Sequence, residues 1–166
     1  KVATKAAVLA KKPDGISHVD IDALSLIGLT AVISIEDTLQ LKVGEKILIQ
    51  GGAGGVAGFA IQLAKHIGAH VITTASAGNH DYVRSLGADE IIDYNAVDFT
   101  EAVSDCDAVF DTVGGDVGLK AFDVLKSGGR AAFIASGAKT YSPCAPTSDG
   151  RVTTWSGLSN STMPVS

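Results

Sequence analysis

Glycines gather in the stretch KILIQGGAGGVAGFAIQLAK, residues 46–65. Within it, residues 52–57, GAGGVA, match the pattern G-x-G-x-x-A. Glycine loses more conformational entropy on folding than other residues, so such a cluster indicates a geometric need. In this pattern Gly52 is expected to make a tight turn and Gly54 to let a pyrophosphate approach the backbone. Ala57 is small enough for a helix and a strand to pack closely.

The chemistry that this loop favours is anion binding, because free amides and the helix dipole at a helix start attract phosphate. A P-loop is excluded, since no Gly-Lys-Ser/Thr follows the loop. Two alternatives are a glycine-rich turn without a ligand and an S-adenosylmethionine methyltransferase, which places an acid at the end of its second strand. The residues expected to bind the dinucleotide here are Gly52, Ala53, Gly54, Gly55 and Val56.

The residues after the second expected strand select the nucleotide. NAD-binding proteins place Asp or Glu about 20 residues after the glycines, to hold the ribose 2′-hydroxyl. The segment HVITTASAGNH, residues 70–80, contains no carboxylate. This absence favours NADP, with Ser76, Asn79 and His80 as donors to the 2′-phosphate, although each also fits a cap or turn. No Arg or Lys lies in the loop, so affinity depends on neutral donors and a partly protonated His80.

Apolar runs and helical periods alternate around the glycine loop, as in a Rossmann-type α/β fold. The runs are short and rich in Val, Ile and Phe, which is typical of strands buried on both faces of a parallel sheet. The alternation implies right-handed crossovers and a doubly wound sheet with helices on both faces. The expected strands are Lys46–Gln50, His70–Ala75, Glu90–Tyr94, Asp107–Asp111 and Arg130–Ala135. Helices are expected over residues 56–67, before Gly87, near Phe99–Val103, and over 117–125, stopped by Gly128 and Gly129.

The two ends of the chain are less regular. Asp20 or Asp22 is expected to cap a helix that carries Leu24, Ile27, Ala31 and Ile35 on one face. Before it, Lys5–Ala10 reads as a short strand. Near the other end, Arg151–Trp155 is at most one short strand.

Composition indicates one globular domain. The chain has 166 residues, of which 46% are hydrophobic and 19% charged, as in ordinary globular proteins. A net charge of −5 without a Lys/Arg cluster predicts that the protein has no nucleic-acid-binding surface. No apolar run is expected to reach the ~18 residues that cross a bilayer, so no membrane partner and a cytoplasmic location are expected. Cys106 and Cys144 offer neither a disulfide framework nor a zinc knuckle.

Five stretches resemble the zinc-independent quinone oxidoreductase-like (zeta-crystallin-like) branch of the medium-chain dehydrogenase/reductase superfamily. They are ALSLIGLTAV, LKVGEKILIQGGAGGVAGFAIQLAKHIGAHVITTAS, LGADEIIDY, FDTVGG and LKSGGRAAF, and they follow the family's order. The family has Gly where this chain has Ala57, and commonly an aromatic residue where this chain has Val32.

The resemblance implies positions along the cofactor. Thr30 matches a threonine near the nicotinamide end, although it could also cap or back-bond within its helix. Ser76 and Tyr94 match residues at the 2′-phosphate, and Tyr94 could instead pack at a strand end. Thr112 and Val113 match the loop after the fourth strand.

The same comparison of residues predicts no metal. Zinc-dependent relatives carry a Cys ligand where this chain has Leu26, and leucine cannot bind zinc. His18, His66 and His70 are expected on separate elements. Asp111 is expected to form a turn rather than to act as an acid, and no catalytic residue is assigned.

The resemblance implies an NADPH-dependent reductase of quinones or α,β-unsaturated carbonyls, with a small electrophile as partner, and it allows a homodimer. The alternative is a non-catalytic NADPH-binding module that acts as a redox sensor or a structural protein. Residues 1–19 are expected to be a remnant of the family's catalytic domain, residues 20–140 the NADP-binding Rossmann domain, and residues 141–166 an irregular tail.

Overall fold

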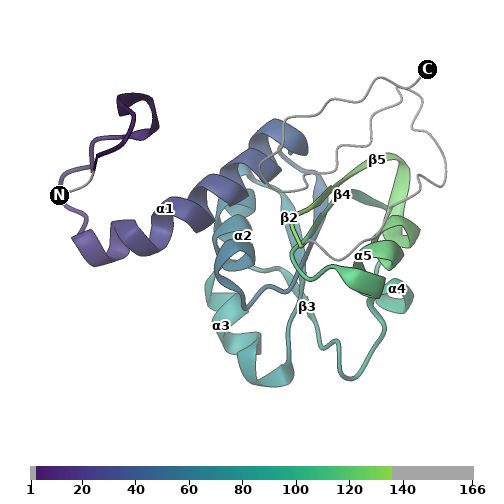
Figure 1. Cartoon of the computed structure of the whole chain (residues 1–166). Helices are drawn as coiled ribbons and strands as arrows, with labels where there is room; N and C mark the ends of the chain where they lie inside the picture. Colours follow the sequence, from purple (N-terminus) through teal and green to yellow (C-terminus); the bar gives the residue numbers. More distant parts are fainter. Residues whose placement is uncertain (1–2, 136–166) are drawn as a thin grey trace, which may run out of the picture.

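A five-stranded parallel sheet forms the centre of the molecule (Figure 1). The computed structural model describes residues 3–135. The strand order β3-β2-β1-β4-β5 places β1 between β2 and β4. Because the chain reverses its direction of winding between β1 and β4, a crevice opens at the carboxyl ends of these strands. The strands are β1 Lys46–Gln50, β2 His70–Thr74, β3 Glu90–Ile92, β4 Cys106–Asp111 and β5 Leu125–Phe133.

Helices cover both faces of this sheet. In Figure 1, α1, α2 and α3 lie on one side of the strands, and α4 and α5 lie on the other. The α/β fold with a doubly wound parallel sheet is therefore confirmed. The α-helices are α1 His18–Val32, α2 Gly55–Ile67, α3 His80–Ser85, α4 Phe99–Ala102 and α5 Gly115–Lys120. Shorter turns of 3₁₀ or π type are η1 Ala6–Val8, η2 Ile33–Thr38, η3 Ala77–Asn79 and η4 Ala121–Val124.

Two hydrophobic clusters hold the helices to the sheet. On one face, the α2 residues Ala57 and Ile61 pack with Ile49 of β1, and all three are fully buried. On the other face, Phe99 of α4 packs in a cluster with Leu48 of β1. Alternate residues of β1 thus serve opposite faces, as expected for a central strand.

The prediction of a helix over residues 117–125 is wrong for the second half of that range. Helix α5 ends at Lys120, η4 follows, and Leu125 already belongs to β5. Leu125 pairs with Cys106 of β4, and the register then shifts before Arg130 pairs with Ala108. Pairing with β4 therefore overrides the helical period.

The expectations before the glycine loop also need correction. Lys5–Ala10 holds the turn η1 instead of a strand. The cap of α1 is Ser17 rather than Asp20 or Asp22, because the Ser17 side chain accepts a hydrogen bond from the backbone N–H of Asp20 at 3.0 Å. The expected strand Arg151–Trp155 lies outside the described residues.

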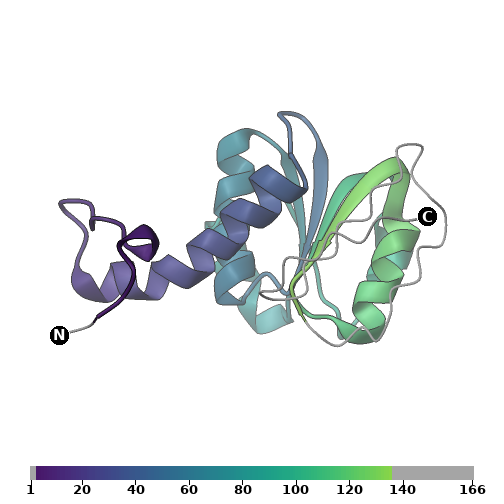
Figure 2. The ribbon, with the colours of Figure 1, turned by 45° about the horizontal axis from the view of Figure 1, so that its top comes forward.

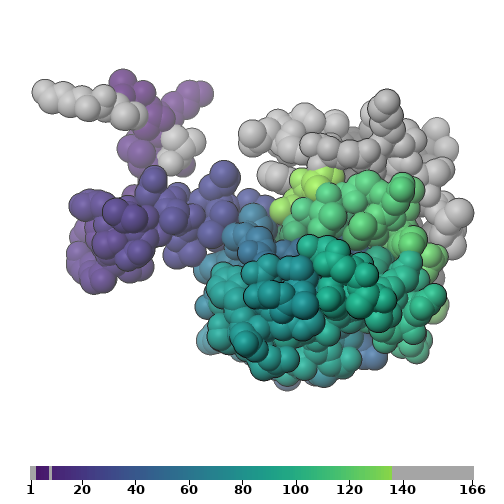
Figure 3. Space-filling model, turned by 90° about the horizontal axis from the view of Figure 1, so that it is seen from below, coloured from purple at the N-terminus to yellow at the C-terminus, as the bar shows by residue number. Residues whose placement is uncertain are grey.

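The expectation that no segment is long and apolar enough to cross a bilayer is wrong. Helix α1 continues into η2, and together His18–Thr38 pass that test by length and composition. One such helix near the N-terminus is weak evidence for a membrane span, because core helices and signal sequences pass the same test; 22% of its most apolar window is buried in the structure. The first half of α1 extends away from the sheet (Figure 2), and this N-terminal arm stands apart from the body in Figure 3.

Candidate functional site

The glycine loop turns sharply directly after β1. Gly51 has a φ of +75°, so Gly51 rather than Gly52 adopts the left-handed conformation of the tight turn. Gly52 has a different constraint, because a Cβ atom there would lie 2.2 Å from the hydroxyl oxygen of Thr73 in β2. Thr74 holds the loop, since its hydroxyl accepts a hydrogen bond from the Gly51 N–H at 3.0 Å.

The start of α2 presents backbone amides that no side chain caps. Gly54 is the N-cap residue in an extended conformation, and the 13-residue helix begins at Gly55. Ala53, Gly54 and Gly55 are all exposed. A Cβ atom on Gly54 would lie 3.2 Å from the carbonyl oxygen of Gly51, so a side chain at this position would crowd the loop. This open, positively polarised cradle fits a pyrophosphate.

A cavity of about 770 Å³ extends from the glycine loop between the loops that follow β2, β3 and β4. Its volume is that of a small-molecule site. Five predicted residues line it: Ala53, Ser76, Asn79, Tyr94 and Val113. The structure thus brings together residues from four separate segments. Strand β3 ends at Ile92, two residues earlier than expected, which leaves Tyr94 in the loop and 59% exposed.

The other predicted residues do not line this cavity. Thr30 donates its hydroxyl to the carbonyl oxygen of Leu26 at 2.9 Å, as a helical threonine that back-bonds does. A ring nitrogen of His80 lies 3.3 Å from the carbonyl oxygen of Ala75. Thr112 donates its hydroxyl to the carbonyl oxygen of Gln50 at 2.8 Å and so ties its loop to β1. The residues outside the lining are Thr30, Gly52, Gly54, Gly55, Val56, His80 and Thr112.

Asp111 forms the turn after β4. Its buried carboxylate accepts hydrogen bonds from the backbone N–H groups of Val113 at 2.9 Å and Gly114 at 3.0 Å. These bonds fix the loop that carries Val113 into the cavity. The expectation that Asp111 is a turn former is confirmed.

Sequence reasoning missed the part of the cavity wall formed by residues 95–99, which follow Tyr94, and by α5. This wall includes Asp98, Val117 and Lys120. Asp98 and Lys120 form an ion pair. The hydrogen bond from Lys120, together with those from the backbone and hydroxyl of Thr100, lowers the pKa of Asp98 to about 2. One indication of this wall was present in the sequence: Asp98 and Lys120 come after strands whose carboxyl ends meet at one edge of the sheet. That indication does not distinguish them from the other residues that follow those strands.

Metal ligands are not grouped within residues 3–135, where no three His, Cys, Asp or Glu side chains lie close enough to hold an ion. Leu26 is 74% exposed on α1. Cys106 is buried in β4, and this burial raises the pKa of its thiol to about 11. Cys144 lies outside the described residues.

Known proteins resemble this chain over most of its length. A 2-methylene-furan-3-one reductase of Solanum lycopersicum is 39% identical over 140 residues, which are 83% of this chain and 35% of that protein. The chloroplastic NADPH-dependent alkenal/one oxidoreductase of Arabidopsis thaliana is 38% identical over 130 residues, 77% of this chain and 33% of that protein. This chain therefore spans about a third of the length of these two relatives.

The fold is also that of solved oxidoreductases. The structure of the quinone oxidoreductase from Coxiella burnetii matches with a TM-score of 0.74 and 41% identity, over 76% of this chain and 40% of that one. A family model described as "Zinc-binding dehydrogenase" matches residues 55–155. Because this match covers more than half of the chain, the protein belongs to the zinc-binding dehydrogenase family, in the quinone oxidoreductase-like branch of the medium-chain dehydrogenase/reductase superfamily.

Proposed function

We propose that the chain is the NADPH-binding domain of an oxidoreductase that reduces quinones or α,β-unsaturated carbonyls. The observation that carries this proposal is the uncapped start of α2, which opens beside a cavity of about 770 Å³. The names of the relatives, a furanone reductase and an NADPH-dependent alkenal/one oxidoreductase, support the reaction class.

Each part of the cofactor would be held by a different segment. The amides at the start of α2 would bind the pyrophosphate. Ser76, Asn79 and Tyr94 would face the 2′-phosphate, and no carboxylate lies on the loop of residues 75–80 to repel it. Asn79 donates its side-chain amide to the Ser76 hydroxyl at 2.9 Å, which orients both side chains. When bound, the nicotinamide supplies the hydride for the electrophile.

The remaining expectations belong to the same proposal. Residues 1–19 would be a remnant of the catalytic domain, residues 20–140 the cofactor domain, and residues 141–166 a tail. We propose that the enzyme is independent of zinc, because Leu26 replaces the cysteine ligand. The small-molecule partner of the enzyme would be the electrophile. We also propose that the enzyme is able to form a homodimer and that it is located in the cytoplasm.

A second candidate is a non-catalytic NADPH-binding module. It is favoured by the absence, among the residues that line the cavity, of a side chain with an evident acid role toward the electrophile. A turnover assay beside a binding titration separates the two functions. Binding of NADPH without its oxidation, in the complete protein, would favour the module.

Titration of the chain by nicotinamide fluorescence tests cofactor choice. We expect NADPH to bind more tightly than NADH. Ser76→Asp should shift the preference toward NADH, since a carboxylate at residue 76 would repel the 2′-phosphate. Equal affinities for NADPH and NADH in the unmodified chain would contradict the proposal.

A further inference from the structure

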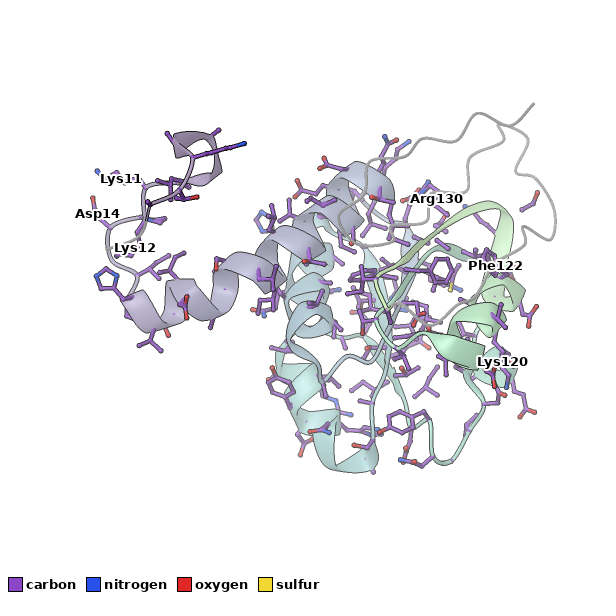
Figure 4. All side chains as sticks on the ribbon, viewed as in Figure 1. Lys11, Lys12, Asp14, Lys120, Phe122 and Arg130 are labelled. Atoms are coloured by element: carbon purple, nitrogen blue, oxygen red, sulfur yellow. The ribbon has the colours of Figure 1, made fainter. Side chains whose placement is uncertain are left out.

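An ion pair closes the cavity on the side formed by α4 and α5. Asp98 is the N-cap residue of α4, Lys120 is the last residue of α5, and both line the cavity. Figure 4 labels Lys120 on α5. The two side chains are 34% and 48% exposed, and ion pairs with this exposure contribute little to folding stability. Folding stability therefore does not by itself explain why a charged pair lies at this wall of the cavity.

Both partners keep hydrogen-bonding capacity that the fold does not use. One Asp98 oxygen accepts from the N–H of Thr100 at 3.1 Å and from its hydroxyl at 2.9 Å, and the other accepts from Lys120. A carboxylate offers about four acceptor positions and an ammonium three donors. Among residues 3–135, the pair thus retains an acceptor on Asp98 and donors on Lys120, side by side.

The cavity wall next to this pair is partly apolar. Val97 and Val113 also line the cavity, yet they are 43% and 51% exposed. The buried ring of Phe99 and the half-buried Val117 lie on the same lining. An aromatic ring that binds against these side chains would remove apolar surface from water, which is favourable. Its edge would then meet Asp98 and Lys120.

We propose that the Asp98–Lys120 ion pair reads the amino edge of the adenine ring. The Asp98 carboxylate accepts a hydrogen bond from the exocyclic N6 amino group, and the Lys120 ammonium donates to ring atom N1. The ion pair is therefore a determinant of base specificity, and this role rests on the proposed dinucleotide site. Hypoxanthine presents the opposite pattern, because position 6 is a carbonyl and N1 carries a hydrogen. The site should therefore bind a hypoxanthine nucleotide more weakly than an adenine nucleotide.

Fluorescence titration of the full chain with NADPH and with its hypoxanthine analogue, deamino-NADPH, tests this inference. We expect the unmodified chain to prefer NADPH by about tenfold, the discrimination of one well-placed hydrogen bond to a charged group. Asp98→Asn keeps a residue type that caps helices but places an amide donor at the edge, so the preference should fall to within about threefold. Lys120→Met should also lower it.

Glu101→Gln is the matched control, because Glu101 is an exposed carboxylate close to Asp98 in sequence but does not line the cavity. It should leave the preference unchanged. An unmodified chain that binds both nucleotides equally, or an Asp98→Asn variant that keeps the full preference, would overturn the inference while leaving the dinucleotide site intact. If neither nucleotide binds, the proposed function itself fails. Should Asp98→Asn not fold, an unchanged preference in Lys120→Met would be decisive against the ion pair.

Discussion

At the scale of single residues, the glycines of the loop have separate tasks. Gly51 supplies the left-handed turn, whereas Gly52 allows β1 and β2 to approach each other. Neither reason for a glycine applies to Gly54. Its backbone is extended, and a Cβ atom there would meet only the carbonyl oxygen of Gly51. Space for the ligand is therefore its proposed role, and this difference can be tested.

Gly54→Val should abolish NADPH binding while the fold persists. The branched side chain would occupy the space in front of the amides of α2, and only the Gly51 carbonyl would need to yield. Fluorescence titration and circular dichroism measure the two effects. Gly52→Ala is the contrasting variant, since its Cβ would overlap Thr73 and cost about 1–3 kcal/mol of unfolding free energy. Normal binding by a folded Gly54→Val variant would show that the phosphate lies elsewhere.

At the scale of elements, long-range contacts stabilise the strands. Asp107 of β4 accepts a hydrogen bond from the N–H of Lys46 in β1 at 2.8 Å and pairs with Lys126 of β5. Its side chain is 15% exposed. One carboxylate thus joins three strands at the end of the sheet opposite the glycine loop. The hydrogen bond from Lys126, followed by that from Lys46, lowers the pKa of Asp107.

Asp107→Asn should lower the free energy of unfolding by about 1 kcal/mol at pH 7, because the charge is lost while an acceptor remains. A carboxyl group whose pKa is lowered on folding stabilises the native state above its ordinary value of 3.8. That contribution is lost as the pH falls through the lowered pKa. Urea unfolding from pH 7 to about pH 2 should show the two proteins converging in stability. If the difference in unfolding free energy between the two proteins does not become smaller in acid, the stabilising role of the Asp107 carboxylate would be contradicted.

At the scale of the whole molecule, the chain matches about a third of two curated relatives. The described cavity lies at the carboxyl ends of the strands, between the loops that follow β2, β3 and β4. Orientation of an electrophile against the nicotinamide is therefore expected to need contacts beyond these loops.

The chain alone should bind NADPH but oxidise it slowly with a panel of quinones. Correct orientation of the acceptor contributes several kcal/mol, about a thousandfold or more in rate. Steady-state oxidation of NADPH measures this rate, and binding under the same conditions confirms that the site is loaded. Efficient turnover by these 166 residues would place the catalytic pocket within this chain.

Zinc should be absent in stoichiometric amounts from the purified protein, and NADPH binding should survive a strong chelator. The reason is chemical, since Leu26 offers no donor atom where zinc-dependent relatives carry a thiolate. Elemental analysis and a titration with chelator provide the measurements. One zinc ion per chain would refute the zinc-independent assignment, despite the substitution at residue 26.

The sequence by itself determined the alternation of elements and the place of the glycine loop. Each of these features depends on neighbouring residues: the helical period of α2, the apolar run of β1, and the glycines between them. The anchoring role of Asp111 was also predictable, because a side chain that bonds to amides two and three residues ahead is a local interaction.

Only the tertiary structure decided which residues share the cavity and where β5 begins. Leu125 fits a helical period, but pairing with β4 draws it into a strand. Asp98 and Lys120 are 22 residues apart, and they meet because α4 and α5 cover the same face of the sheet. Local sequence patterns do not predict such long-range contacts. Side chains from distant segments become neighbours only when the crossover connections bring the carboxyl ends of the parallel strands to one edge of the sheet.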